Sequence, residues 1–238
     1  SLQPLLGDLT PGDSLSDIND LNSLILSLDS ELAQQGHEVA FISASVLDPQ
    51  KIMEQNTNPN LEYVILQPGE AGLKQMHEYM ANNTGISGVH IISHGGDGFI
   101  SLNGIKIDKA YIDAHIADFA AWQNALTPDA DILVYGCDVA NSDNGKVFIN
   151  KLAEITLADV SASTDTTGRD SNWNLEFTVG AVETQNIVVV GYDYRLTAYT
   201  VTSNADSGVN TLRAIIASST NGDEINFNLG TGQETITI

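Results

Sequence analysis

Runs of apolar residues alternate with helix-like segments along most of this chain. Apolar runs with polar flanks predict strands at residues 38–43, 61–66, 89–92, 131–136 and 158–162. Apolar positions that recur every three or four residues predict helices at residues 49–53, 69–82, 109–126 and 144–157. Strands that are apolar throughout and alternate with helices are typical of a parallel sheet that is covered on both faces. The pattern therefore predicts an α/β fold.

Three segments depart from this alternation. Residues 1–38 are rich in Leu, Asp and Ser, and apolar residues at helical spacing predict one lead-in helix that ends near Gly36. A Gly-rich loop with a hairpin is predicted at residues 99–107. From residue 172 the helical signal stops, and the runs at residues 173–179 and 187–190 predict antiparallel strands beside the sheet.

The last segment, residues 197–238, contains TVTSNADSG, then TLRAII, then EINFNL. This order resembles the opening coil of the parallel β-helix stalks of bacterial adhesins. A single coil cannot bury its own face, because solenoid repeats are stabilised by their neighbours. We therefore expect the first coil of a right-handed β-helix that continues in the natural protein. The alternative is a C-terminal hairpin that belongs to the main domain.

The charge and the cysteine count exclude several classes of function. Nine basic residues against 31 acidic ones give a net charge of −22, which repels nucleic acid and anionic lipid. We find no apolar run near the roughly 18 residues that a membrane helix needs, so no membrane insertion is expected. The single cysteine, Cys137, excludes an internal disulfide and a Cys-rich zinc site.

Two predicted strands end in residues that can carry chemistry. One runs into Ser93-His94-Gly95-Gly96 and the other into Tyr135-Gly136-Cys137-Asp138. The carboxyl ends of parallel strands meet at one edge of a sheet, so the thiol and the imidazole are expected to meet there. An imidazole can deprotonate a thiol and turn it into a nucleophile. Cys137 and His94 are therefore a candidate catalytic pair.

The glycines beside the histidine favour the same chemistry. A glycine lets its backbone N–H approach a carbonyl oxygen with no side chain in the way. The amides of Gly95 or Gly96, together with that of Cys137, could form an oxyanion hole, in which each donor is typically worth about 2.7–4 kcal/mol. Taken singly, a buried Cys is more often a small packing residue and a His beside Gly a turn residue.

These blocks resemble two related groups of proteins. An apolar block ending in His-Gly, then another ending in a small residue and Cys, resembles the clan CD cysteine peptidases such as caspases, legumains, gingipains and separases. His94 precedes Cys137 by 43 residues, close to the roughly 50 residues found in caspases. Residues 39–195 are still more similar to the bacterial family DUF4347, whose blocks "VHIVSHG" and "LLLYGCNVA" read VHIISHG and ILVYGCDVA here.

The resemblance implies a caspase-like α/β/α sandwich with a mostly parallel sheet. It divides the chain into a lead-in at residues 1–38, a DUF4347 domain at residues 39–196 and the start of a β-helix at residues 197–238. It also implies an exported protein, extracellular or on the bacterial cell surface, because the family occurs at the front of long surface proteins.

The implied activity is that of a cysteine endopeptidase that acts on a polypeptide, including its own chain, and needs no cofactor. The rival is an inactive caspase-like module that supports adhesion or secretion. A third reading is a β-helix polysaccharide lyase or hydrolase with its active site beyond residue 238.

In clan CD enzymes, a pocket binds the side chain of the substrate residue that precedes the cut bond. The ends of the strands on either side of the nucleophile form this pocket. The resemblance points to Ser43, Tyr135, Ser163 and Asp165 as substrate-binding residues. Asp165 could pair with a basic substrate side chain, which makes Arg169, Arg195 and Arg213 candidate self-cleavage sites, or it could simply cap a turn. The caspase motif around the cysteine is missing and Ser43 stands where relatives often have Asp, so caspase specificity is not carried over.

Metal binding has a weaker signal. Asp138, Asn141, Asp143 and Asn144 offer oxygen ligands for calcium but lack the spacing of an EF-hand, which favours a solvated loop. The other four histidines lack metal-ligand spacing; we expect His90 in the core, His77 and His115 on helices, and His37 in a loop. The sequence thus predicts no metal site, with calcium left open.

Overall fold

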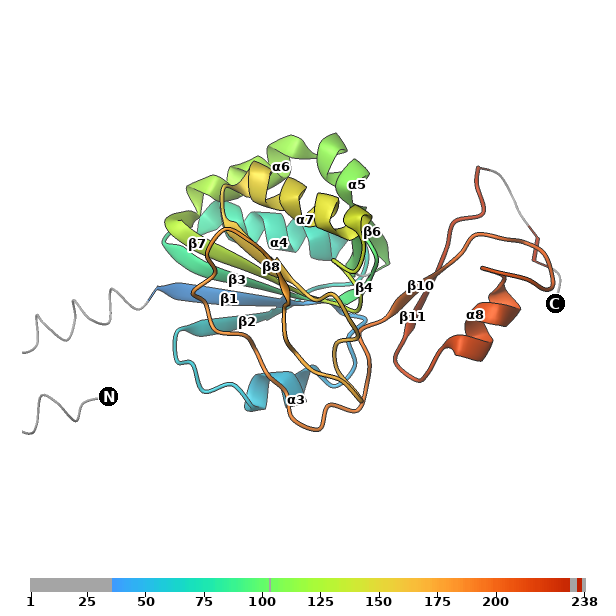
Figure 1. Ribbon diagram of the computed structural model, residues 1–238. Helices are drawn as coiled ribbons and strands as arrows, with labels where there is room; N and C mark the ends of the chain where they lie inside the picture. Colours follow the sequence, from blue (N-terminus) through green and yellow to red (C-terminus); the bar gives the residue numbers. More distant parts are fainter. Residues whose placement is uncertain (1–35, 103, 232–234, 237–238) are drawn as a thin grey trace, which may run out of the picture. The chain divides into compact units, whose positions relative to one another are not determined.

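A six-stranded sheet carries the fold in the computed structural model (Figure 1). Its strands, in spatial order, are β2 (Leu61–Ile65), β1 (His37–Ile42), β3 (Ile86–Ile92), β7 (Leu126–Tyr135), β8 (Asp159–Ala162) and β9 (Phe177–Val179). The first five are parallel, and β9 pairs with β8 in the antiparallel sense. The predicted α/β fold with a mostly parallel sheet is confirmed.

The structure describes residues 36–102, 104–231 and 235–236. The helix predicted near residues 21–32 lies outside these residues. His37–Ile238 form one compact unit, so contacts continue across the boundary that the sequence predicts after residue 196. Among the described residues, no helix has the length and apolar character needed to cross a membrane.

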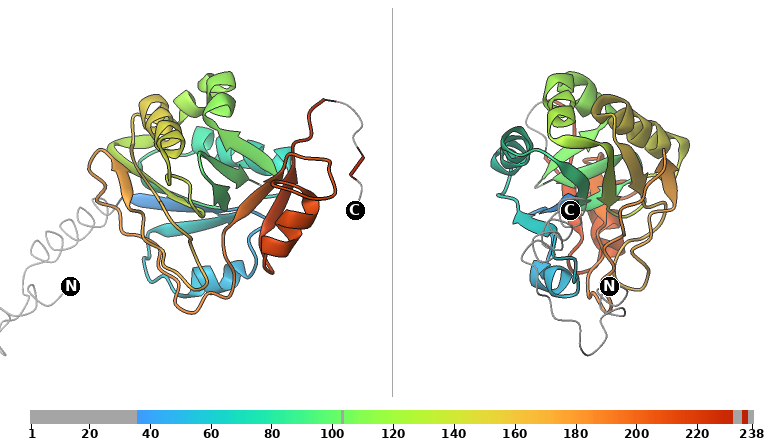
Figure 2. Two further views of the ribbon diagram at one scale, coloured as in Figure 1. Left: turned by 45° about the vertical axis from the view of Figure 1, so that its right-hand side comes forward. Right: turned by 90° about the vertical axis from the view of Figure 1, so that its left-hand side faces the viewer.

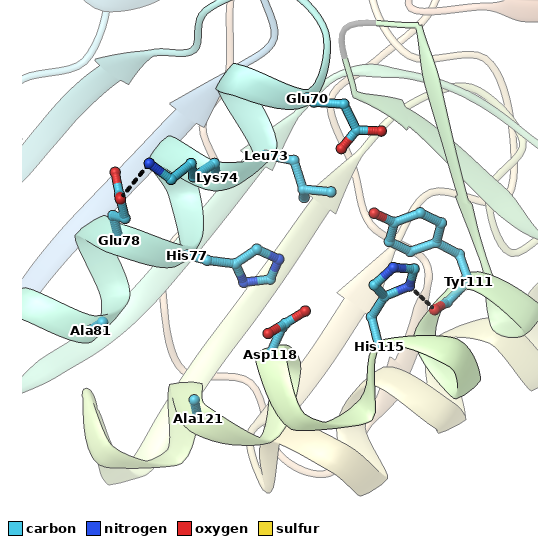
Figure 3. A pocket seen from close by; sticks show the side chains of 10 residues that line it. All are labelled: Glu70, Leu73, Lys74, His77, Glu78, Ala81, Tyr111, His115, Asp118 and Ala121. Carbon is cyan, nitrogen blue, oxygen red and sulfur yellow. Dashed lines mark hydrogen bonds and ion pairs between the residues drawn. The ribbon is translucent and has the colours of Figure 1, made fainter.

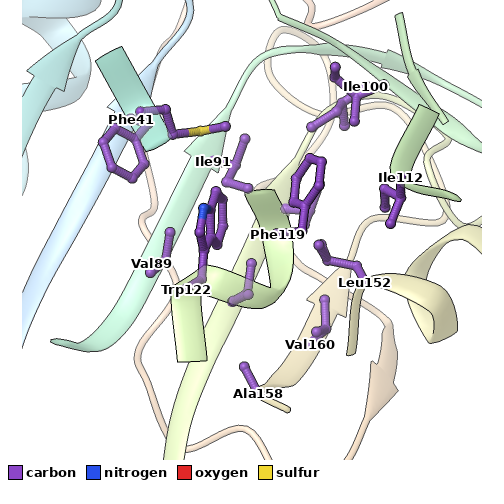
Figure 4. Packing of buried hydrophobic residues seen from close by; sticks show 14 of the residues in the cluster. Phe41, Val89, Ile91, Ile100, Ile112, Phe119, Trp122, Leu152, Ala158 and Val160 are labelled. Carbon is purple, nitrogen blue, oxygen red and sulfur yellow. The ribbon is translucent and has the colours of Figure 1, made fainter. Parts of the chain in front are cut away.

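The two faces of the sheet have different covers (Figures 1 and 2). One face carries α4 (Glu70–Asn82), α5 (Lys109–Ala114), α6 (Ile116–Ala120), a 3₁₀ turn (Ala121–Asn124) and α7 (Asp143–Thr156). Side chains that alternate along a strand point to opposite faces, so Val39 and Phe41 join this core, whose packing Figure 4 shows.

The other face is covered by α3 (Pro49–Glu54) and by chain that forms no regular element, residues 180–196. Ala40 and Ile42 pack there with Ile187 and Val189. The strand predicted at residues 187–190 is wrong, because this segment pairs with no strand of the sheet. It keeps the alternating burial of a strand: Ile187 and Val189 are buried, and Val188 and Val190 are exposed.

Other predicted boundaries change in detail. The helix predicted at residues 109–126 breaks at His115 into α5 and α6, and Leu126 already belongs to β7, which therefore includes Pro128. The strand predicted at residues 173–179 is limited to β9. His37, expected in a loop, begins β1. The predicted hairpin is present as β5 (Phe99–Leu102) and β6 (Ile105–Asp108), and β4 (His94–Gly96) adds a third strand to it.

The C-terminal segment forms β10 (Ala198–Val201), α8 (Leu212–Ser218) and β11 (Glu224–Phe227). β10 and β11 are parallel neighbours. The alternative of a C-terminal hairpin is therefore wrong, because a hairpin pairs its strands in the antiparallel sense.

The strand order places a topological switch point between β1 and β3. From β1 the chain goes first to β2 on one side, and the later strands β3, β7 and β8 are added on the other side. In open α/β sheets, ligands bind outside the carboxyl ends of the strands at such a point. Ser43, which follows β1, and His94, which follows β3, both lie there.

Candidate active site

The loops after β3 and β7 are in direct contact. A Cβ atom on Gly95 would lie 3.2 Å from the Gly136 carbonyl carbon and 3.2 Å from the Cys137 oxygen. A Cβ on Gly136 would lie 3.2 Å from the Gly95 nitrogen. Only residues without a side chain let the two backbones approach this closely. The structure thus brings the His94-Gly95 loop against the Gly136-Cys137 loop, as the sequence predicts.

His94 is fixed through one ring nitrogen. The ring is 1% exposed, and Nε2 lies 3.1 Å from the Ser45 carbonyl oxygen in the loop after β1. A carbonyl oxygen only accepts, so Nε2 carries the proton and Nδ1 is the basic nitrogen of the neutral ring. Nδ1 is buried and has no hydrogen-bond partner among the described residues, so the predicted catalytic pair is not joined by a hydrogen bond from Nδ1 to Cys137 Sγ. The histidine is thus held in the tautomer that leaves one nitrogen free to take a proton.

Cys137 has no exposed surface; its thiol donates to the Thr167 carbonyl oxygen (3.5 Å), and its sulfur accepts from two donors. The Thr167 N–H and the Thr197 hydroxyl each lie 3.2 Å from Sγ. Burial raises the pKa of the thiol to about 11, although these donors and the Leu196 backbone act in the opposite direction. Helix α7 begins only at Asp143, and Asp138 turns the chain with a φ of 59° directly after the cysteine. The helix dipole therefore contributes little to the thiol.

Two backbone amides at the site share one acceptor. The N–H groups of Gly95 and of Cys137 both donate to the Leu196 carbonyl oxygen, each over 2.9 Å. Donors of a working oxyanion hole lie about 2.7–3.1 Å from the oxygen that becomes charged. The amide predicted from Gly95 or Gly96 is thus that of Gly95 in this geometry.

The chain that supplies this carbonyl runs through the site in an extended form. Residues 194–196 pair in the antiparallel sense with residues 167–169, through Arg169 N–H to the Tyr194 oxygen (2.8 Å) and Leu196 N–H to the Thr167 oxygen (3.1 Å). A Cβ on Gly168 would lie 2.4 Å from the Tyr194 oxygen, so a side chain there would prevent the pairing. No local pattern in the sequence indicates this pairing.

The predicted substrate-binding residues lie on two sides of this segment. Ser43 is fully buried, and its hydroxyl lies 2.9 Å from that of Ser45, which also positions His94. Tyr135 is fully buried in the same hydrophobic cluster as Leu196. Its hydroxyl accepts from the Ile187 N–H (2.8 Å) and contacts His90 Nδ1 (3.2 Å), and burial raises the pKa of Tyr135.

Ser163 and Asp165 line the loop that follows Cys137. Their carbonyl oxygens accept from Ala140 N–H (2.9 Å) and Asp138 N–H (2.7 Å). The Asp165 carboxylate is exposed and accepts from Ser163 Oγ (3.4 Å) and Asn172 (3.3 Å). These contacts hold the loop that follows Cys137 in place.

The loop predicted as a calcium candidate is held by internal contacts. Asn141 donates to the Asp138 carboxylate over 3.0 Å, and Asn144 donates to the Asp97 carbonyl oxygen over 3.4 Å. Asp97 also accepts from the N–H (3.0 Å) and the hydroxyl (2.6 Å) of Ser142, which caps α7. His90, expected in the core, is buried and bonded to Glu38 over 3.0 Å.

A different group of acids could hold a metal ion. Asp131, Asp159 and Glu183 offer oxygens that lie within 4.8 Å of one another. Sequence reasoning missed this group because its members lie far apart in the chain: Asp131 lies within β7, Asp159 begins β8, and Glu183 comes from a segment without regular structure.

A surface pocket of about 420 Å³ lies elsewhere, between α4 and the helices α5 and α6 (Figure 3). His77 and His115 face it together with Tyr111, Glu70 and Asp118. Burial lowers the pKa of His77. None of its lining residues belongs to the catalytic pair or to the predicted substrate-binding set, so the pocket is separate from the chemistry at Cys137.

A family profile described as "Domain of unknown function (DUF4347)" matches residues 39–195. The chain belongs to this family. No curated protein matches the chain. A solved structure that matches is a short chain dehydrogenase family protein from Francisella tularensis subsp. tularensis SCHU S4, with 14% identity and a TM-score of 0.25. The match covers 51% of this chain and 61% of that one. The DUF4347 region ends one residue before Leu196.

Proposed function

We propose that the DUF4347 domain of this chain is a cysteine endopeptidase of the caspase-like type. Cys137 is the nucleophile, His94 is the general base and acid, and the amides of Gly95 and Cys137 hold the oxyanion. The substrate is a polypeptide. As part of the same proposal, the protein acts outside the cell or on its surface, as the adhesin-like pattern of residues 197–238 suggests.

One observation carries the proposal: two backbone N–H groups beside the only thiol converge on a single carbonyl oxygen. Acyl transfer needs this arrangement, because negative charge develops on that oxygen when the nucleophile adds to the carbonyl carbon. The loss of one such donor typically costs about 2.7–4 kcal/mol of transition-state stabilisation. A purely structural thiol would not require a neighbouring pair of convergent donors.

The arrangement of His94 supports the role of base. Its Nε2 donates to Ser45, which leaves Nδ1 free to take the thiol proton and later to give it to the leaving amine. The carbonyl of Ser45 has the orienting role that a carboxylate has in a Ser-His-Asp triad. The pair can therefore act without a third charged residue.

The inactive module remains the second candidate, because one observation favours it. Cys137 is fully buried and burial raises the pKa of its thiol to about 11, so little thiolate exists near pH 7. A nucleophilic cysteine usually has a lowered pKa and some exposure. Activity in this domain therefore depends on proton transfer to His94 during the attack.

The experiment is cleavage of a complex peptide library by the purified chain, with identification of new termini by mass spectrometry. We expect new termini with the parent chain and none with Cys137→Ala. His94→Ala should reduce cleavage by about 10²–10⁴-fold, the usual contribution of general acid–base catalysis.

His77→Ala is a matched control, since His77 lines the separate pocket on the helical face. It should leave library cleavage unchanged. A parent chain that gives no new termini, and whose Cys137 reacts with peptidyl chloromethylketones no faster than a free thiol, would establish the inactive module instead.

A further inference from the structure

We propose that the Leu196–Thr197 peptide bond is a substrate of the chain's own Cys137–His94 site, so that the domain cuts itself from residues 197–238. This inference rests on the proposed peptidase function and adds to it the bond that is cut and the kind of side chain that precedes it.

The first argument is the position of the Leu196 carbonyl group. It accepts 2.9 Å hydrogen bonds from both Gly95 and Cys137, which are the two donors assigned to the oxyanion. A carbonyl oxygen held by both donors is polarised toward addition at its carbon. The peptide bond that contains this carbonyl is the one between Leu196 and Thr197.

The second argument is the conformation of the residues before that bond. Residues 194–196 pair in the antiparallel sense with residues 167–169, through one bridge and two backbone hydrogen bonds. Adding a strand to an exposed sheet edge is a general way to bind a peptide, in which main-chain hydrogen bonds supply the affinity. Residues 194–196 are thus bound as a peptide substrate would be, up to the carbonyl at the donors.

The third argument is the position of the thiol. The Thr197 hydroxyl lies 3.2 Å from Cys137 Sγ, and the N–H of Thr167, whose carbonyl oxygen accepts from Leu196 N–H, lies at the same distance. Thr197 also forms a parallel bridge with Gly95. The nucleophile, the donor loop and the residues on both sides of the bond are therefore in contact.

The reaction balances without a further reagent except water. Cys137 Sγ adds to the Leu196 carbonyl carbon while its proton passes to His94 Nδ1. The C–N bond to Thr197 then breaks, the proton moves to the departing nitrogen, and Leu196 is left as a thioester on Cys137. Water hydrolyses the thioester, which gives a Leu196 carboxylate and restores the thiol.

The inference makes Leu196, an apolar residue, the one that precedes the cut bond. Leu196 is fully buried, in one cluster with Tyr135 and Trp173. Arg195, a candidate when a basic residue is expected, is one position earlier, and its guanidinium pairs with Asp170 at 3.6 Å. The site therefore favours large apolar side chains over basic ones at the position before the bond.

Contacts beyond the cut bond keep the two products together. β10 begins at Ala198 and pairs with β11, the Thr197 carbonyl oxygen accepts from Glu224 N–H (2.9 Å), and Glu224 is hydrogen-bonded to Ser101 in β5. The two fragments therefore separate only after denaturation, and the native mass should change only by that of the added water.

The experiment is denaturing mass spectrometry of the intact purified chain during incubation, with sequencing of any new N-terminus. We expect a fragment that begins at Thr197 from the parent and none from Cys137→Ala. Leu196→Met and Arg195→Ala keep the apolar residue and should still cleave, whereas Leu196→Lys should lose cleavage. A thermal unfolding curve of each variant shows whether it is folded.

The outcomes separate this inference from the peptidase proposal. If the parent cuts the peptide library but stays intact at Thr197, the self-cleavage inference fails, because the Leu196 segment then leaves the site for other peptides without being cut. A Cys137-dependent cut at another bond also overturns it. If neither the library nor the chain is cut, both proposals fail.

A different observation carries a second inference: the geometry points to a calcium site at Asp131, Asp159 and Glu183. Asp131 is 1% exposed, and its Oδ1 has no hydrogen-bond partner among the described residues. Its Oδ2 accepts from Glu183 N–H (3.0 Å) and Thr184 N–H (2.8 Å). Carboxylates within 4.8 Å of one another repel unless a cation or protons neutralise them.

The chemistry of the group fits a hard divalent cation. All the offered atoms are carboxylate oxygens, which calcium prefers. Asp131 and Asp159 are register partners at the first residues of their paired segments of β7 and β8, and Glu183 comes from the irregular chain that leads to Leu196. A bound ion would therefore clamp the start of that chain to the sheet.

The test is thermal unfolding of the chelator-treated chain with added CaCl₂ or MgCl₂. We expect Tm to rise by roughly 5–10 °C at a calcium concentration about 100 times Kd. Asp159→Asn and Glu183→Gln should reduce this shift, whereas Asp143→Asn, in the exposed loop that the sequence offers for calcium, should keep it. A Tm that calcium does not change, or changes equally in all variants, overturns the site.

Discussion

Replacement of Gly95 by alanine tests the assignment of the oxyanion donors. The new Cβ would lie 2.7 Å from Val139 Cγ2 and 3.2 Å from backbone atoms of Gly136 and Cys137. A contact under 3.0 Å cannot be kept, so one of the two parts must shift. Because the backbone of Gly136 and Cys137 lies close on the same side, we expect the Gly95 loop to move away from it. The Gly95 N–H would then leave its 2.9 Å position on the carbonyl oxygen.

The loss of one donor sets the magnitude. At about 2.7–4 kcal/mol, the rate of the chemical step should fall by about 10²–10³-fold. The assay is the first-order rate of appearance of the Thr197 terminus, together with turnover of a library peptide that the parent cleaves. Both rates should fall, because both reactions use the same donor.

Gly96→Ala is the matched control. Its Cβ would be crowded to a similar degree, 2.6 Å from Phe99 Cε1 and 3.3 Å from the Ala198 carbonyl oxygen, so the variant controls for crowding of the loop. The Gly96 amide is not one of the two donors on the Leu196 oxygen. We expect Gly96→Ala to keep its rate within about tenfold. Equal losses in the two variants, or a Gly95→Ala chain with the parent rate, would refute the donor assignment.

Four further predictions concern Cys137 and two residues elsewhere in the domain. Since burial raises the pKa of Cys137 to about 11 from an ordinary 9.0, iodoacetamide should label the folded chain slowly at pH 7 and faster as the pH approaches 11. By linkage, Cys137 contributes about 2–3 kcal/mol of stability below pH 9 that is lost as the pH rises to 11, measured as the difference in urea unfolding between the parent and Cys137→Ala. His90→Phe should lower stability by about 1–3 kcal/mol, because Glu38 and Tyr135 lose a hydrogen-bond partner, and should leave cleavage by the folded chain unchanged; a loss of cleavage would give His90 a role in the chemistry. Asp97→Ala should lower stability by about 1–3 kcal/mol in urea unfolding, since it removes two hydrogen bonds to Ser142; an unchanged midpoint would contradict this.

The sheet could be predicted from the sequence because its strands are buried on both faces. Such strands are apolar at every position, as in residues 89–92 and 131–136, and their ends are marked by polar residues or glycine. The second cover of the sheet could not be predicted. Within residues 180–196, Ile187 and Val189 point inward as in a strand. The backbone N–H groups nearby donate to the side chains of Tyr135 and Gln55 and not to a neighbouring strand.

The candidate active site, too, could be predicted from the sequence only in part. His94, Gly95 and Cys137 follow apolar strands, so the general rule for strand ends brings them together. The site also uses the backbone carbonyls of Leu196 and Ser45 and the hydroxyl of Thr197. A backbone carbonyl is present in every residue, so the sequence gives no sign of its role. Thr167 and Leu196 pair across a long stretch of chain, which local patterns do not report.

The occupied site accounts for the high pKa of its own nucleophile. The desolvation that raises the Cys137 pKa acts on a thiol that contacts Thr197 and lies against the Leu196 backbone. In the uncut chain the thiol is shielded from water and donates to the Thr167 carbonyl oxygen (3.5 Å), so the proposed attack needs transfer of the thiol proton to His94. Once the bond is cut, β10 stays paired and the two products stay together, but the new Leu196 carboxylate is no longer tied to Thr197; its departure from the thiol would admit water and lower the pKa of Cys137. A chain that has cut itself should therefore be alkylated at Cys137 faster than the uncut His94→Ala chain at the same pH, and equal rates would mean that the segment stays in the site after cleavage.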